Sequence, residues 1–195
     1  NQQIRNRILW YEDEITSGDH LMVVKNNYFA LPKDSKAGFI ANGDQIVIKR
    51  ILRIQERHGF RFAKAEVNLV DYPDEPEFET YLLLDAIYVD RPSMTYDDGN
   101  RLYKSVEREY ANIKTKYKRF QAIKTDPYFN ALQVKFAYAI TCHKAQGGQW
   151  KNVFIEQGYL PDNTVDKEYL RWLYTAFTRA IDKVYLIGFK PIFFK

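Results

Sequence analysis

The sequence contains one cysteine and three histidines and lacks any long hydrophobic run, and each shortage excludes a class of protein. The lone thiol of Cys142 rules out an internal disulfide framework and fits a reducing compartment, so we expect a cytoplasmic location. The histidines lie too far apart in the sequence to suggest a zinc site. No apolar run approaches the roughly 20 residues of a membrane span, and no signal peptide is visible, so we expect no membrane partner.

The sequence also has no phosphate-binding loop of the form G-x-x-x-x-G-K-[ST]. For this reason, the apolar run that ends at Asp85 is not interpreted as the Mg²⁺-binding strand of a nucleotide hydrolase, although the pattern is similar. Acidic residues cluster between Asp71 and Glu79 around two prolines, and a solvated loop is favoured there over a metal site. The formal net charge of +4 permits a nucleic-acid partner without requiring one.

The most informative stretch lies between residues 136 and 155. Two short apolar runs, 136–140 and 153–155, are typical of strands buried on both faces of a parallel sheet. The segment between them is rich in hydrogen-bond donors and contains the pair Gly147-Gly148, which allows backbone N–H groups to approach a ligand. Because open α/β sheets bind ligands beyond the carboxyl ends of their strands, this segment is a candidate ligand loop. A polar turn between two core strands is the alternative.

A second unit follows between residues 169 and 187. Apolar side chains recur there at helical spacing, with Arg171, Thr175 and Arg179 on another face of the predicted helix. A short turn at Asp182 leads into an apolar run, so we expect a helix, a turn and a buried strand. Taken alone, Arg179 is a surface or helix-end arginine near Asp182.

Together, these two stretches resemble a known family. Residues 141–150 read T-C-H-K-A-Q-G-G-Q-W, which resembles motif V of the superfamily 1 DNA helicases. Residues 173–180 read L-Y-T-A-F-T-R-A, which resembles their motif VI. The order and separation resemble the RecD-like and Dda-like branch, which has a UvrD-type C-terminal motor domain. The close resemblance covers roughly the last third of the chain.

The resemblance implies a discontinuous α/β fold. Residues 1–16 and 125–195 would form the second motor domain, a RecA-like parallel-sheet domain of the P-loop NTPase type without a P-loop of its own. In this family, the pair Ile4-Arg5 would follow motif IV, whereas a solvated helix-face charge is the alternative for Arg5. Because the chain opens at Asn1 without a methionine, we expect a piece of a longer protein.

The middle of the chain has its own pattern. Between residues 17 and 92, turn signals alternate with short predicted strands, including separate strands at 46–48 and 51–54 and a last strand at 81–89. A hairpin turn is predicted at His58-Gly59, and the set of strands is typical of a small antiparallel barrel. The resemblance implies an inserted SH3-like β-barrel here. The pattern of residues 93–124 predicts a basic amphipathic helical arm. This arm is expected to be a single helix that continues to about Ile123. Its lysines and arginines would raise the affinity for phosphate, with an ordinary solvated face as the alternative.

The resemblance also implies site residues. Arg179 would be the catalytic arginine finger, which stabilises charge on the phosphoryl group being transferred. Cofactor contacts would come from Gln146, Gly147, Gln149 and Arg179. Contacts to the nucleic-acid backbone, from groups that donate to phosphate without reading sequence, would come from Thr141, His143, Lys144 and Thr178. ATP and Mg²⁺ are the implied cofactors, bound mainly by an N-terminal RecA-like domain of the same protein.

Three positions depart from the family pattern. Ala145 replaces the usual serine and loses a hydroxyl donor, and Trp150 replaces a phenylalanine, which indicates core packing under the loop. Gly148-Gln149 stands where a Ser-Glu pair is common, so Gln149 can hydrogen-bond to the nucleotide sugar but brings no charge.

The implied function is that of the C-terminal part of an ATP-dependent DNA helicase, inactive as an ATPase by itself. The resemblance implies a location in the bacterial cytoplasm or nucleoid. A nucleic-acid-binding module without a motor role is one alternative. The motor subunit of a RecD-like ATP-dependent exonuclease is another. Expected partners are single-stranded DNA, the N-terminal RecA-like domain, and nuclease or replication and repair proteins.

Overall fold

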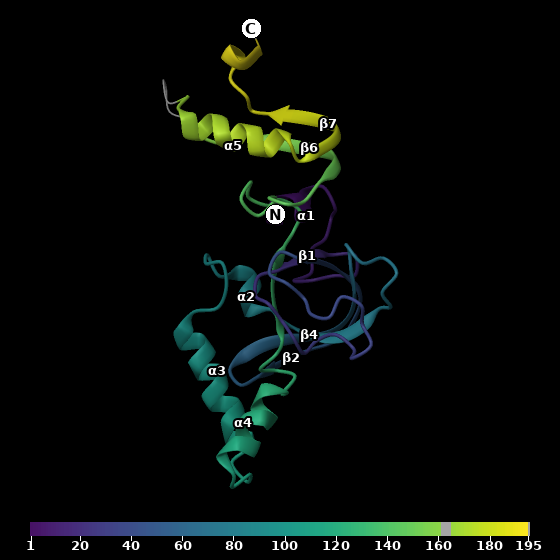
Figure 1. Cartoon of the computed structure of the whole chain (residues 1–195), viewed down its shortest axis with the longest axis vertical. Coiled ribbons are helices and arrows are strands. Elements are labelled where there is room, and N and C mark those ends of the chain that lie inside the picture. The colour runs from purple at the N-terminus through teal and green to yellow at the C-terminus, as the bar shows by residue number, and fades with distance from the viewer. Residues whose placement is uncertain (161–164, 195) are drawn as a thin grey trace. The chain divides into compact units, whose positions relative to one another are not determined.

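The chain divides into two compact units, residues 1–139 and 140–195. The structure is a computed structural model, and it describes residues 1–160 and 165–194. Within these residues, the first unit contains a closed five-stranded β-barrel with four helices, and the second contains a two-stranded parallel sheet with one α-helix (Figure 1). None of the described helices is both long and apolar enough to cross a membrane.

The barrel closes by pairing its five strands in sequence order and then pairing the last strand with the first. The strands are β1 (His20–Val23), β2 (Gln45–Arg57), β3 (Phe60–Leu69), β4 (Phe78–Leu83) and β5 (Leu132–Phe136). Pairing is antiparallel between β1 and β2, β2 and β3, β3 and β4, and β5 and β1. It is parallel between β4 and β5, so the barrel is of mixed type.

The hairpin predicted at His58-Gly59 is confirmed. Both residues have positive φ, +57° and +73°, which is the backbone of the tight two-residue turn that matches strand twist. The prediction of separate strands at 46–48 and 51–54 is wrong, because β2 runs continuously through both segments. Register shifts at Ile48/Arg50 and Ile51/Arg53 mark bulges that bend this long strand. In the sequence, these bulges are visible only as interruptions of the apolar pattern.

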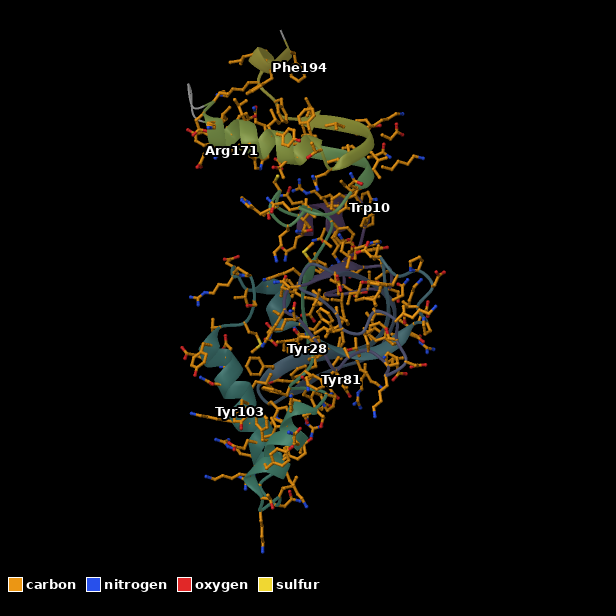
Figure 2. The ribbon with its side chains drawn as sticks, in the orientation of Figure 1. Trp10, Tyr28, Tyr81, Tyr103, Arg171 and Phe194 are labelled. Atoms are coloured by element: carbon orange, nitrogen blue, oxygen red, sulfur yellow. The ribbon has the colours of Figure 1, made fainter. Side chains whose placement is uncertain are left out.

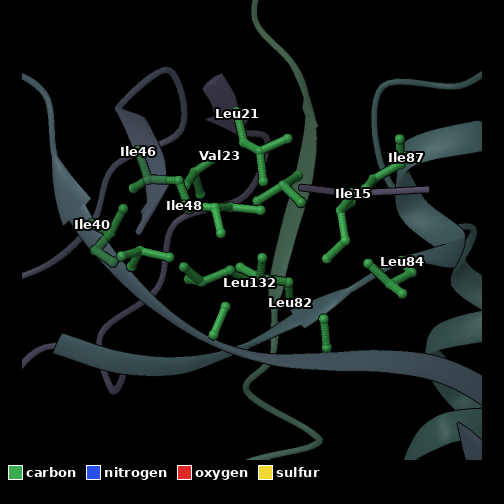
Figure 3. Packing of buried hydrophobic residues seen from close by; sticks show 14 of the residues in the cluster. Ile15, Leu21, Val23, Ile40, Ile46, Ile48, Leu82, Leu84, Ile87 and Leu132 are labelled. Carbon is green, nitrogen blue, oxygen red and sulfur yellow. The ribbon is translucent and has the colours of Figure 1, made fainter. Parts of the chain in front are cut away.

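The barrel interior is filled by apolar side chains from every strand (Figure 3). β5 shows the principle: Leu132, Val134 and Phe136 are buried, whereas the two residues between them are half-buried. This alternation is that of a strand with one face toward a core. Ile15 and Ile40, from loops, close the interior, and both are almost fully buried.

The predicted RecA-like α/β fold is wrong. β5 lies in the region assigned to the motor sheet, yet it pairs with β1 at Leu21↔Phe136 and with β4 at Leu82↔Leu132, and so completes the barrel. The apolar run 136–140 is therefore not a strand buried on both faces, because β5 ends at its first residue. Among the described residues, the only parallel pair outside the barrel is the two-stranded sheet of the second unit.

The helices of the first unit also differ from the prediction. The expected strand at 81–89 ends early, and the chain turns into α2 (Asp85–Tyr88). The expected single helix of the arm is two helices, α3 (Tyr96–Glu109) and α4 (Lys116–Lys124), shown in teal in Figure 1. α3 begins at Thr95, whose hydroxyl accepts a hydrogen bond from the Asp98 amide at 3.0 Å. Both helices bury apolar residues in a second core beside the hairpin of β2 and β3.

The N-terminal helix α1 (Gln2–Arg7) is attached to the barrel by a buried ion pair. Arg5 is only 4% exposed, and its Nε and Nη2 donate to the carboxylate of Asp19, which is fully buried, at 2.8 and 2.9 Å. The solvated helix-face charge considered for Arg5 is therefore wrong. The carboxylate also accepts from the Thr16 amide and the Tyr138 hydroxyl, so both of its oxygens are fully used.

The second unit follows the order predicted from its sequence. β6 (Trp150–Glu156), α5 (Lys167–Phe177) and β7 (Ala180–Ile187) form a parallel β–α–β unit, which confirms the predicted helix and the positions of both predicted strands. The predicted burial of these strands is wrong, because Ile155 is their only buried residue. A short 3-10 helix, η1 (Pro191–Phe194), follows. Asp166 begins α5, since its carboxylate accepts a hydrogen bond from the Tyr169 amide at 2.7 Å. Figure 1 shows α5 lying along the two strands.

Candidate functional site

The candidate ligand loop, residues 141–149, is a tight turn that precedes β6. The Ala145 amide donates to the Thr141 carbonyl at 3.1 Å, and the Gly148 amide donates to the Ala145 carbonyl at 3.1 Å. Ala145 itself is buried, which explains why a small apolar residue fits where a serine is usual in the family. Thr141, His143 and Lys144 are exposed.

The two glycines of the loop have different roles. Gly147 has φ = +87°, a left-handed conformation that residues with a Cβ rarely adopt, and the space around it is open. Gly148 has an ordinary φ, but a Cβ there would lie 2.9 Å from two carbons of the Trp150 ring. Only the open side of Gly147 therefore fits the expected approach of a ligand, whereas Gly148 makes room for the indole of Trp150.

Arg179 joins the end of α5 to this loop. Its Nε donates to the Thr175 carbonyl at 3.0 Å, and its Nη1 donates to the Gly148 carbonyl at 3.1 Å. The backbone repeats the connection, since the Trp150 amide donates to the Arg179 carbonyl at 2.9 Å. The guanidinium therefore lies at the junction of the two segments that carry the motif resemblance, and it is half-buried there.

The hydroxyl of Thr178 already has partners at this junction. It lies 3.0 Å from the Tyr174 carbonyl and 3.1 Å from the Thr175 carbonyl, and it accepts a hydrogen bond from Arg179 Nη2 at 3.0 Å. Because a hydroxyl has a single hydrogen, Thr178 can offer a further ligand only an acceptor unless it gives up these carbonyls. Its predicted contact to a phosphate thus requires a local rearrangement.

A cavity of about 470 Å³ lies between the loop and α5. It is lined by two predicted site residues, His143 and Gln146, together with Cys142, Glu168, Tyr169, Arg171, Trp172 and Thr175. The other predicted site residues do not line it: these are Thr141, Lys144, Gly147, Gln149, Thr178 and Arg179. The structure therefore divides the predicted set between this cavity and the Arg179 junction.

Arg171 is the arginine of this cavity, and it was not among the site residues predicted from the sequence. It lies on α5 one helical turn before Thr175, which is also in the lining, and its side chain is exposed (Figure 2). The signal was present, since Arg171 and Arg179 are on the polar face of the predicted helix. The family motif, however, begins two residues after Arg171.

Cys142 lies in the wall of the same cavity. Its thiol donates to the Trp172 carbonyl at 3.5 Å, and burial raises the pKa of the thiol, an effect that the positive charge of Arg179 opposes. A raised pKa keeps the sulfur protonated and unreactive. Within the described part of the chain, no group of three His, Cys, Asp or Glu residues is arranged to hold a metal ion.

Comparison with known proteins connects this unit to a family. Residues 136–187 match the model of the UvrD-like helicase C-terminal domain. The match supports a UvrD-like helicase C-terminal region here. It spans the loop, α5 and both strands of the parallel sheet, and so it includes the Arg179 junction and the cavity. The match suggests a helicase-related role for this part of the chain.

Two curated relatives share part of the sequence. The chain is 29% identical over 102 residues to an uncharacterized protein of Acanthamoeba polyphaga mimivirus, and the alignment covers 47% of this chain and 20% of that protein. It is 39% identical over 69 residues to an uncharacterized protein of Methanocaldococcus jannaschii, covering 35% of this chain and 6% of that protein. The chain therefore spans a fifth or less of the length of the curated relatives it matches.

Proposed function

We propose that the chain is the C-terminal part of an ATP-dependent DNA helicase of the RecD-like and Dda-like branch. The observation that carries the proposal is the position of Arg179, which hydrogen-bonds both to the end of α5 and to the Gly148 carbonyl of the loop. In this role, the arginine acts on nucleotide bound mainly by another domain of the longer protein. The loop contributes part of the groove for single-stranded DNA.

The residues at the junction are better suited to supplying part of a nucleotide-binding site than to forming a whole site. Arg179 has five N–H donors, and contacts within the described residues use three of them, which leaves two for a phosphate oxygen. The sequence has no phosphate-binding loop. Bound ATP with Mg²⁺ supplies the phosphoryl group, and Arg179 stabilises the charge that develops during its transfer. Gln146, Gly147 and Gln149 are the other proposed contacts, and all three are exposed.

The loop also supports binding to the backbone of a nucleic acid. Thr141, His143 and Lys144 present a hydroxyl, an imidazole and an ammonium group on one short turn, and all three are exposed. Such groups donate to phosphate oxygens without reading bases. Because Arg179 donates a hydrogen bond to the Gly148 carbonyl of the same turn, a change in the ligand of the guanidinium would alter the position of the loop. This connection is a physical route from ATP turnover to movement along a strand.

The test is Arg179→Ala in the full-length enzyme. We expect ATP turnover to fall roughly 10³-fold or more, while the affinity for nucleotide changes little, because the arginine acts mainly on charge in the transition state. Lys167→Ala is the control, since it removes a positive charge from an exposed residue of α5 that does not line the cavity. Near-normal kcat in the Arg179 variant would show that Arg179 only stabilises the packing of α5 against the loop.

A second test uses the chain by itself. We expect no DNA-stimulated ATP hydrolysis and weak binding to single-stranded DNA. Log K should fall with log salt at a slope of about −1 to −3, since few phosphates are neutralised. Combining Thr141→Ala with His143→Ala should weaken binding at every salt concentration and leave the slope almost unchanged. ATP turnover by the chain alone that survives Arg179→Ala would contradict the proposed division of the site.

A further inference from the structure

The barrel unit carries an exposed aromatic pair that its own core does not use. Tyr28 and Phe39 are stacked with their ring centroids 5.1 Å apart and their planes 23° from parallel. They are 63% and 40% exposed, so one ring face of the pair remains open to solvent. Both belong to the long connection between β1 and β2, and Figure 2 labels Tyr28 on the barrel.

This connection is held in place, so the pair is presented by a fixed backbone. Asn27 is buried and forms a bridge with Ile40 across the loop. Its side-chain oxygen accepts from the amides of Phe29 and Ala30 at 2.9 and 2.8 Å, and its Nδ2 donates to the Asn130 carbonyl at 2.7 Å. Ordering costs for a ligand are therefore small on the protein side.

The connection that carries the pair is rich in lysine. Lys25, Lys33 and Lys36 lie on the same connection, which also carries two acidic residues, Asp34 and Asp44. The Glu75 carboxylate accepts a hydrogen bond from the Lys36 amide at 2.6 Å. The ammonium of Lys124, at the end of α4, lies 5.8 Å from the ring centre of Phe29. None of the ion pairs formed within the described residues involves any of these four lysines. Their charge is therefore available to an anionic ligand.

We propose that residues 25–40 and Lys124 form a second nucleic-acid-binding surface, on which a base of a single strand stacks against Tyr28 and Phe39. Stacking on aromatic rings between cations is the chemistry by which proteins hold single strands without reading their sequence. A proline-rich peptide would also use exposed aromatics, but it would not use the lysines of this connection, so a polyanion fits better. The surface lies on the barrel and does not depend on the proposed role of Arg179.

The experiment compares two oligonucleotides that have the same number of phosphates. One is a thymidine oligomer, and the other has abasic sites in place of the bases; both are titrated into the full chain by fluorescence anisotropy. Tyr28→Ala and Phe39→Ala should each weaken binding of the thymidine oligomer about 5- to 150-fold and leave the abasic oligomer unchanged. Lys124→Gln should weaken both and flatten the salt slope by about 0.7. Tyr28→Phe and Tyr96→Ala, a highly exposed tyrosine on α3, are the controls and should bind normally.

Equal losses with both oligonucleotides, or no loss with either, would overturn the proposal and leave the surface to a protein partner. The loop variants at Thr141 and His143 weaken both oligonucleotides alike, so failure of the motor proposal is visible separately. If the alanine variants do not fold, the wild-type chain is photocrosslinked to a 5-iodouracil oligonucleotide. Adducts on Tyr28 or Phe39 support the stacking site, and adducts confined to other residues refute it.

Discussion

The ion pair between Arg5 and Asp19 should be the most sensitive single interaction in the barrel unit. The two side chains are 4% and 0% exposed and share two charged hydrogen bonds of 2.8 and 2.9 Å. Arg5 also donates to the Asp13 carbonyl, and its guanidinium lies 4.9 Å from the ring centre of Phe136 in β5. The pair thus connects α1 and the loop before β1 to the strand that closes the barrel.

The expected effect of Arg5→Met follows from this burial. The variant leaves the Asp19 carboxylate buried with only the Thr16 amide and the Tyr138 hydroxyl as donors. Leaving one charge of a buried pair without its partner costs about 3–5 kcal/mol. A domain is stabilised by about 5–15 kcal/mol in total, so the variant should lose a large share of its stability. Asp19→Asn in the same chain removes the orphaned charge and should restore part of the loss.

Chemical denaturation of the single and double variants measures the coupling between the two residues. Native-state hydrogen exchange of the β1 amides assigns the loss to the barrel unit rather than to the second unit. Arg7→Met is the matched control, because Arg7 is exposed on the same helix and should change stability by no more than about 0.5 kcal/mol. A loss below about 1 kcal/mol for Arg5→Met would show that the pair behaves as an exposed one and would refute the reasoning.

Three further predictions test other parts of the structure. Gly148→Ala places a Cβ 2.9 Å from two ring carbons of Trp150, so it should lower the thermal unfolding midpoint of the second unit. Adding Trp150→Leu removes the ring and should restore that midpoint. Burial and the hydrogen bond to Asp126 raise the pKa of Tyr110 to about 12. Because the tyrosine of the unfolded chain ionises first, the free energy of unfolding should fall as the pH rises from about 10 toward 12. Tyr110→Phe should make that fall smaller in denaturation experiments across this pH range. Burial raises the pKa of the Cys142 thiol, so iodoacetamide should alkylate it more slowly than it alkylates glutathione at pH 8, and equal rates would contradict its burial.

Features that depend on neighbours in the sequence were predictable. The turn at His58-Gly59, the helix around Arg171 and the two strands of the second unit each follow from residues a few positions apart. The motif resemblance led to the same loop and helix that the family model matches. The junction itself is consistent with this, since the Arg179 side chain reaches the Gly148 carbonyl 31 residues away through a short β–α–β unit.

Features that depend on distant partners were not predictable from the sequence pattern. Leu132, Val134 and Phe136 would fit either a motor sheet or a barrel, because the alternation of a strand does not say which strand it pairs with. The choice depends on β1, more than a hundred residues earlier in the chain, and on the parallel contact with β4. Family resemblance then favoured the wrong sheet, since it is carried by residues that follow β5.

The contacts of Arg5 explain why β5 is part of the barrel. Its guanidinium bonds to Asp19 just before β1 and lies over the ring of Phe136 at the end of β5. Tyr138, two residues beyond β5, adds its hydroxyl to the same carboxylate. Without β5 in the barrel, Asp19 would lose the Tyr138 donor and Arg5 would lose its aromatic cover, so a charged pair would lie at an open edge. The polar groups around Asp19 therefore select the pairing of β5 with β1, which the apolar pattern alone leaves open.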